Sequence, residues 1–170
     1  MDDFSKTLES LQAQLREEAT VKGADDIQVG DIIYYDMDRA DGIVPKDGFD
    51  TRLKYVVVAG AKSNDKEICA VLVNSDNDYS ADADWQAEQY CIRQADYPGI
   101  LEKDSWIDCS DPKELLVKKL KAKKAEKKGS LNARDLRCVM RHLQENDFVD
   151  EHMRKVYGIR NFDCGENIDQ

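Results

Sequence analysis

Two runs of β-branched and small apolar residues, at 54–59 and 68–73, constrain the fold of this chain more than any other feature. Residues of this kind fit the pleated, half-buried surface of a β-strand. The short connector at 60–66 is rich in Gly, Ser, Asn and Asp, which favour turns. The sequence therefore predicts two long strands that form an antiparallel hairpin.

Three further runs, at 32–35, 89–93 and 105–109, have the same character. The last two are separated by the turn sequence Tyr-Pro-Gly at 97–99. No helix of crossover length is indicated between any of the five runs, so parallel βαβ units are not expected. Short strands joined by turns predict one small, mainly antiparallel β-barrel between residues 29 and 110, with helices on both sides of it.

An amphipathic helix is expected in residues 1–22, before the barrel. Its apolar residues recur at helical spacing, while charged residues occupy the rest of the helix. Four large apolar side chains are too few to stabilise such a helix alone, so we expect it to pack on the barrel or on a partner. The sequence leaves open whether it docks on the barrel, pairs with another copy or forms a mobile arm. The four residues are Phe4, Leu8, Leu11 and Leu15.

Helices are also expected after the barrel, in residues 111–160, where they would pack on it. Asp111 is suited to cap a helix that begins at Pro112 and continues through a lysine-rich stretch to Lys128. Asn132 is expected to cap a second helix, and Asp147 a third and shorter one.

The charge of the chain is unevenly distributed. The 170 residues have a formal net charge of −10, which argues against a general nucleic-acid coat. Eight lysines and two glutamates between 113 and 128 nevertheless give that stretch a balance of +6. This basic stretch is compatible with a localised nucleic-acid site or with a solvated lysine face of a helix.

Cysteine spacing and hydropathy indicate a reduced, cytoplasmic protein. The five cysteines are odd in number and widely spaced, and no two form a Cys-x-x-Cys pair. They predict free thiols, with neither a disulfide framework nor a metal site. No run approaches the roughly 20 apolar residues of a membrane-spanning helix, and the acidic N-terminus does not resemble a signal peptide.

The order of three motifs resembles the PemK/MazF family, the toxins of bacterial type II toxin–antitoxin systems. The motifs are Val-Gly-Asp-Ile-Ile-Tyr-Tyr-Asp at 29–36, Thr-Arg-Leu-Lys-Tyr-Val-Val-Val at 51–58 and Val-Leu-Val-Asn-Ser at 71–75. The stretch 97–110 is also similar to longer members of the family. Leu53 stands where a proline is usual. The resemblance implies an SH3-like barrel.

The resemblance also implies a metal-independent endoribonuclease that cleaves single-stranded mRNA without a cofactor. Arg52 and Ser75 would be the catalytic pair, by their positions at the start of the second strand and the end of the third. A guanidinium can donate two parallel hydrogen bonds to phosphate oxygens as negative charge develops on them. Serine could donate to the phosphate or orient the 2′-hydroxyl. The implied partners are a second copy in a homodimer and a cognate antitoxin protein.

Residues that would contact the RNA are expected beside this pair and in the basic stretch. Lysines would neutralise phosphates, amides would form hydrogen bonds, and a tryptophan in a loop could stack on a base. These RNA-binding candidates are Lys54, Asn74, Asn77, Trp85, Lys118, Lys119 and Lys121.

Arg52 and Ser75 could instead have structural roles. An arginine at the start of a strand commonly forms a surface ion pair, here with Asp47 or Asp50, and a serine at a strand end commonly shapes a turn. The alternative function is a non-catalytic SH3-like module that binds a protein partner through the aspartate-rich loop at 36–50.

Overall fold

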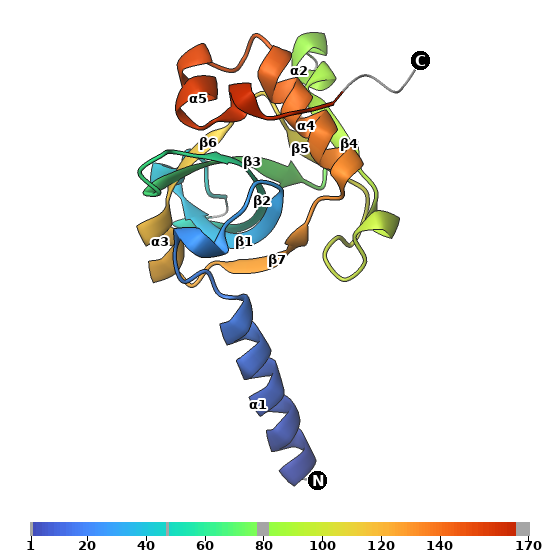
Figure 1. Ribbon diagram of the computed structural model, residues 1–170. Helices are drawn as coiled ribbons and strands as arrows, with labels where there is room; N and C mark the ends of the chain where they lie inside the picture. The colour runs from blue at the N-terminus through green and yellow to red at the C-terminus, as the bar shows by residue number, and fades with distance from the viewer. Residues whose placement is uncertain (1, 47, 78–81, 166–170) are drawn as a thin grey trace.

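The structure is a computed structural model that describes residues 2–46, 48–77 and 82–165. It contains helices at both ends of the chain and a sheet between them (Figure 1). The helices are α1 (Asp2–Ala19), α2 (Ala83–Ala87), α3 (Val117–Ala122), α4 (Ala133–Glu145) and α5 (Glu151–Val156). The strands are β1 (Asp31–Asp38), β2 (Thr51–Ala61), β3 (Glu67–Asn74), β4 (Gln89–Ile92), β5 (Ser105–Asp108), β6 (Lys113–Leu116) and β7 (Glu126–Ser130).

All five expected strands are confirmed, and every pairing in the sheet is antiparallel. The strand order is β4-β5-β3-β2-β1-β7, and β6 lies off this path beside β3. The expected hairpin is formed by β2 and β3, with Tyr55 opposite Val73 and Val57 opposite Val71. β3 has two partners along one edge, because β6 pairs with its first half and β5 with its end.

The expected closed barrel is wrong, because the seven-stranded sheet is open. Among the described strands, β6 pairs only with β3 and β7 only with β1, and β7 has one further isolated bridge between Glu126 and Thr20. The two strands would have to pair with each other to close the sheet on that side. They are instead connected through α3, whose buried Val117 and Leu120 fill the space inside the curved sheet.

The expected helix from Pro112 to Lys128 is also wrong. This stretch contains β6, the short helix α3 and β7. The first half of β3 offers a free edge, and β6 occupies it with Leu115 buried and Glu114 exposed. Pairing with β3 and β1 thus overrides the helical preference of the lysine-rich sequence, because strand stability depends on such non-local contacts.

The two faces of the sheet bury separate hydrophobic clusters. One face packs against α4 and α5, whose positions over the sheet are visible in Figure 1, and includes Val57, Val71 and Met140. The other face lies inside the curve of the sheet and includes Val56, Val58 and the α3 residues. Because both faces are covered, β2 and β3 appear in the sequence as continuous apolar runs.

A glycine in β2 allows the C-terminal helices to approach the sheet closely. A β-carbon at Gly60 would lie 2.2 Å from the carbonyl oxygen of Tyr157. The neighbouring Ala61 donates its backbone N–H to that oxygen at 3.2 Å. The register of β2 with β3 also shifts between Val58 and Gly60. Any side chain at position 60 would therefore displace the end of α5.

The N-terminal helix is confirmed, but its packing on the sheet is not. Figure 1 shows α1 projecting from the rest of the molecule, with its N-terminal end farthest away. Its base is attached where Val21 donates its backbone N–H to Ala125 at 2.8 Å. No helix within the described ranges is long and apolar enough to cross a membrane.

A buried carboxylate attaches α4 to β4 and to the turn that follows. Asp135 is 1% exposed and accepts hydrogen bonds from the hydroxyls of Tyr90 at 2.7 Å and Tyr97 at 2.5 Å. The expected cap is confirmed, since Asn132 Oδ1 accepts the backbone N–H of Asp135 at 2.8 Å. The third helix is capped by Asp150 and not by the expected Asp147.

We expect Asp135→Ala to lower the free energy of unfolding by about 1–3 kcal/mol, because the buried hydroxyl of Tyr97 and the partly buried hydroxyl of Tyr90 would lose their acceptor. Urea denaturation would measure the change. Asp96→Ala is the matched control, because it removes an exposed carboxylate that pairs with Arg134 at 3.3 Å. Such a surface pair contributes about 0–1 kcal/mol. Equal effects of the two substitutions would contradict the assigned role of Asp135.

Candidate functional site

Two cavities meet at the open end of the β2–β3 hairpin. Their volumes are about 520 and 560 Å³. Arg52, Lys54 and Ser75 line both cavities, so these three residues form a shared wall between them. Both members of the expected catalytic pair are therefore brought to one place, together with one of the expected RNA-binding lysines.

The strand register explains why these side chains gather. Because Tyr55 lies opposite Val73, the preceding Lys54 comes opposite Asn74. The Lys54 ammonium donates to Asn74 Oδ1 at 2.6 Å, which confirms that the two side chains share a face. Arg52 lies two residues earlier on the same strand and hence on the same face. Ser75 follows β3 directly, next to this face of the sheet.

Arg52 is available to a ligand. Its side chain is exposed and forms no hydrogen bond or ion pair with any residue that the structure describes. The alternative pairing with Asp50 is therefore absent, and Asp47 lies outside the described residues. Ser75 is exposed as well. A guanidinium and a hydroxyl that face a cavity without partners are free to donate to an anion.

Lys54 differs chemically from the other lysines of the chain. Burial, followed by repulsion from Arg52 and Lys46, lowers the pKa of its ammonium group to about 8. Asp108 opposes the shift, because its carboxylate favours the protonated form. The charge of Lys54 therefore changes near neutral pH, in contrast to an ordinary lysine.

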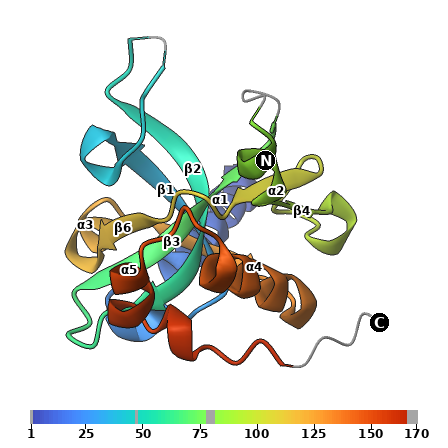
Figure 2. The same cartoon turned by 90° about the horizontal axis from the view of Figure 1, so that it is seen from above.

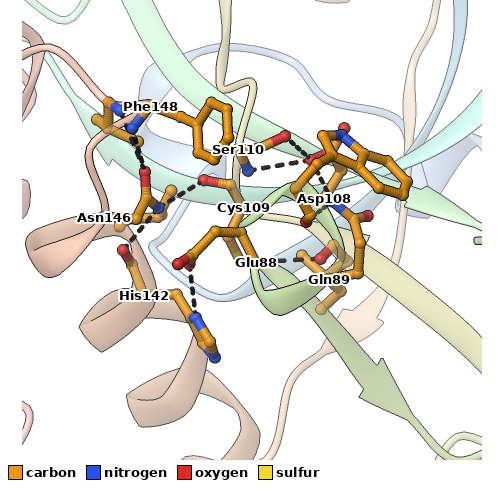
Figure 3. Close-up of polar contacts among 12 residues, drawn as sticks. Glu88, Gln89, Asp108, Cys109, Ser110, His142, Asn146 and Phe148 are labelled. Atoms are coloured by element: carbon orange, nitrogen blue, oxygen red, sulfur yellow. Dashed lines mark hydrogen bonds and ion pairs between the residues drawn. The ribbon is translucent and has the colours of Figure 1, made fainter. Parts of the chain in front are cut away.

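Asp108 reaches the first cavity from β5 and is held by its neighbours (Figure 3). Its Oδ1 atom accepts hydrogen bonds from Gln89 Nε2 at 2.8 Å and from the backbone N–H of Ser110 at 3.0 Å. The Ser110 hydroxyl donates to the same oxygen at 2.5 Å. Asp108 was not predicted from the sequence, because a single aspartate at the end of a strand has no local signature.

A second set of contacts connects this region to α4, as Figure 3 also shows. Asn146 donates its side-chain amide to the carbonyl oxygen of Cys109 at 2.9 Å and accepts from the backbone N–H of Phe148 at 3.0 Å. His142 Nδ1 lies 2.8 Å from a carboxylate oxygen of Glu88. These contacts fix the end of β5, and with it the position of Asp108.

The segment between β1 and β2 forms one side of the first cavity through residues 42–44 and Lys46. It projects from the sheet, as Figure 2 shows. Its first turn is closed by a capping box in which the Asp38 and Asp41 side chains accept from each other's backbone N–H groups. The Lys119 ammonium lies 2.6 Å from Asp38 Oδ1 and 2.9 Å from Asp41 Oδ1.

The positive charge of Lys119 is thus paired with the carboxylates of Asp38 and Asp41 in the same chain. Hydrogen bonds from Lys119, and secondarily from Lys123, hold the pKa of the Asp38 carboxyl well below its usual range. Lys123 also donates to the carbonyl oxygen of Asp36 at 2.9 Å. Two lysines of the basic stretch therefore stabilise the aspartate-rich segment beside the cavity.

The other expected RNA-binding residues lie elsewhere. Asn77 donates to Gln86 Oε1 at 3.4 Å, and the half-buried Trp85 belongs to α2. Lys118 and Lys121 are exposed on α3. None of these residues lines either of the two cavities.

Two aromatic rings line the second cavity. Tyr34 and Tyr55 come from the paired strands β1 and β2, and their ring centroids are 4.7 Å apart with an interplanar angle of 35°. Residues 100–103 form the opposite side. Partly exposed aromatic rings beside cationic side chains are suited to stack on nucleic-acid bases. From the sequence, Tyr34 was predicted only as a strand residue.

Within the ranges that the structure describes, no three His, Cys, Asp or Glu side chains lie close enough together to hold a metal ion. The charged groups at the shared wall are the two cations Arg52 and Lys54, with Asp108 nearby. Arg52 and Lys54 offer hydrogen-bond donors to an anion at the shared wall.

The sequence matches no protein-family model, and a search of curated proteins returns no significant match. The resemblance to the PemK/MazF family consequently depends on the order of the three motifs.

We expect the pKa of Lys54 to rise from about 8 toward the value of an exposed lysine in Arg52→Gln, because a repelling cation is removed. NMR titration of lysines labelled at the ε-carbon would measure it. Arg93→Gln is the control, because Arg93 is exposed and lines neither cavity. An unchanged Lys54 pKa in Arg52→Gln would show that the two side chains do not interact.

Proposed function

We propose that this protein is an endoribonuclease that cleaves single-stranded RNA at the shared wall, as the resemblance to PemK/MazF toxins implies. The observation that carries the proposal is that Arg52 and Ser75 converge on two adjoining cavities, where Arg52 has no hydrogen-bond or ion-pair partner among the described residues. The resemblance assigns these two residues as the catalytic pair, and the strand register brings them together.

The proposed reaction is an attack by the 2′-hydroxyl of RNA on the neighbouring phosphate. The bond from O2′ to phosphorus forms as the bond from phosphorus to O5′ breaks, which yields a 2′,3′-cyclic phosphate and a 5′-hydroxyl. Negative charge concentrates on the non-bridging oxygens in the transition state. Arg52 is assigned to donate two hydrogen bonds to these oxygens, and preorganised donors of this kind commonly give the largest catalytic effect.

Ser75 and Lys54 are assigned supporting roles. Ser75 donates a neutral hydrogen bond to the phosphate or orients the 2′-hydroxyl. The Lys54 ammonium, kept in place by Asn74, adds positive charge on the same face of the sheet. Its partial burial strengthens its attraction to phosphate, because charges interact more strongly where water is excluded.

The substrate class follows from the surroundings of the shared wall. The two cavities are lined by four cations, which are Lys46, Arg52, Lys54 and Lys103, and by three carboxylates, which are Asp76, Glu102 and Asp108. The cations therefore outnumber the carboxylates there, although the whole chain is acidic. Cations beside the Tyr34–Tyr55 pair suit a strand whose bases are unpaired and free to stack. We assign single-stranded RNA, and not a duplex, for this reason.

On this proposal the curved sheet is an open variant of the SH3-like fold, in which α3 connects β6 to β7. A homodimer and a cognate antitoxin protein are implied by the resemblance alone.

The competing proposal is a non-catalytic module that binds a basic protein through its aspartate-rich segment. Asp38 and Asp41 are occupied by Lys119, which leaves fewer acidic groups for such a partner.

We expect Arg52→Ala to lower the rate of RNA cleavage on the order of 10²–10³-fold, because one preorganised donor is lost. Arg52→Lys should restore only part of the rate, since an ammonium cannot form the paired hydrogen bonds. Ser75→Ala should lower the rate less, because a neutral donor is removed. Single-turnover cleavage of a labelled RNA in EDTA would measure all three.

Arg93→Ala is the matched control and should cleave at the wild-type rate, because Arg93 lines neither cavity. Cleavage at the full rate by Arg52→Ala would show that the activity resides elsewhere or in a contaminant. A folded wild-type protein that binds RNA without cleaving it would favour the non-catalytic module.

The contribution of Lys54 should depend on pH. Its ammonium group loses its proton as the pH rises through about 8, whereas an arginine at that position would stay charged. The ratio of the wild-type rate to the Lys54→Arg rate should therefore fall between about pH 6 and about pH 10. Taking the ratio cancels the intrinsic pH dependence of the 2′-hydroxyl. A constant ratio would contradict the assigned role of Lys54.

A further inference from the structure

The N-terminal helix α1 exposes a continuous apolar stripe. The exposed fractions of its four large apolar residues are 78% for Phe4, 47% for Leu8, 52% for Leu11 and 63% for Leu15. Figure 1 shows the helix extending away from the sheet, so the body of the same molecule does not cover this stripe. Isolated exposed leucines are common, but a contiguous apolar surface indicates an interaction site.

The spacing of the stripe is that of a coiled-coil seam. The intervals between successive residues are four, three and four, which match alternating d and a positions of a heptad repeat. Side chains at these positions fall along one side of the helix. A stripe that packed against a flat sheet would be wider. The pattern therefore favours another helix as the occupant.

The residues that flank the seam carry no charge. Heptad positions e and g are occupied by Ser5, Thr7, Gln12 and Gln14. In coiled coils these positions select the partner, through attraction between opposite charges or repulsion between like charges. Uncharged flanks let two identical helices approach without repulsion, although each whole chain has a net charge of −10.

The ionisable side chains of the stripe-bearing part of α1 lie away from the seam. They occupy the outer b, c and f positions, while Glu18 stands beyond the last apolar residue of the stripe. Outer positions stay in water when two such helices pair. Those with described side chains are Asp3, Lys6, Glu9, Arg16 and Glu17.

The stability of α1 requires a partner that buries its apolar stripe. Most of the stability of a helix in a protein comes from packing of its apolar face, and the apolar face of the 18-residue α1 is exposed. Two paired stripes would bury roughly 1,000 Å² in total, which is near the lower limit for a specific interface. Such an interface supports a reversible dimer and not a permanent one.

We propose that α1 is a self-association helix, whose apolar stripe packs against the same stripe of a second copy of this chain. The stripe is self-complementary, as a two-fold interface requires. Its uncharged flanks give no preference for an acidic or basic partner. This inference concerns α1 alone and holds whether or not the protein cleaves RNA.

Sedimentation velocity of the full chain between about 1 and about 200 μM tests the proposal, because an interface of this size gives micromolar affinity. Wild type should shift from monomer to dimer over this range. Leu8→Glu/Leu11→Glu should weaken association more than about tenfold, because it places charges in the seam. Ser10→Glu/Ala13→Glu adds the same charge on the outer face and should associate like wild type.

Circular dichroism at 222 nm provides a second readout, because helix α1 should form together with the dimer. Helical signal should increase with concentration in wild type and in the outer-face variant, but not in the seam variant. A wild type that stays monomeric at the highest concentration would overturn the proposal. So would a dimer that forms equally well in the seam variant, because the body of the protein would then hold it together.

Discussion

The antiparallel pairing of β2 with β3 is the interaction on which the rest of the structure depends. It is the centre of the sheet, and its residues contribute to both hydrophobic clusters. The same register places Lys54 beside Asn74 and brings Arg52 to the open end of the hairpin, where Ser75 begins the next connection. A slip of one residue would turn every side chain of a strand to the opposite face. Core packing therefore fixes the geometry of the candidate site.

Several charged side chains of this protein form ion pairs with one another. Lys119 and Lys123 of the basic stretch bind the aspartates at the end of β1, so neither set is a free patch. Two of the cations that line the cavities beside the hairpin are Arg52, which has no partner among the described residues, and Lys54, whose pKa is lowered to about 8 mainly by burial. An acidic chain can thus present a local site for an anion, because interactions between exposed charges are screened over about 10 Å.

The sequence predicted the five main strands and the hairpin, because their apolar runs are long and the turn chemistry between them is clear. It failed at β6 and β7, where lysine-rich sequence forms strands only because β3 and β1 offer free edges. The site was predictable as far as Arg52 and Ser75, through the motif order. Asp108 and the Tyr34–Tyr55 pair were not, because their roles arise from contacts between strands distant in sequence.

The proposed mechanism requires the shared wall to promote attack by a 2′-hydroxyl on phosphate. The most direct test compares a single-stranded RNA with the same RNA carrying one 2′-deoxy nucleotide at the mapped cleavage position. Mass spectrometry of the products should show a 2′,3′-cyclic phosphate and a 5′-hydroxyl from the RNA, and no cleavage at the 2′-deoxy position. Cleavage of both substrates at that position at equal rates would contradict the account.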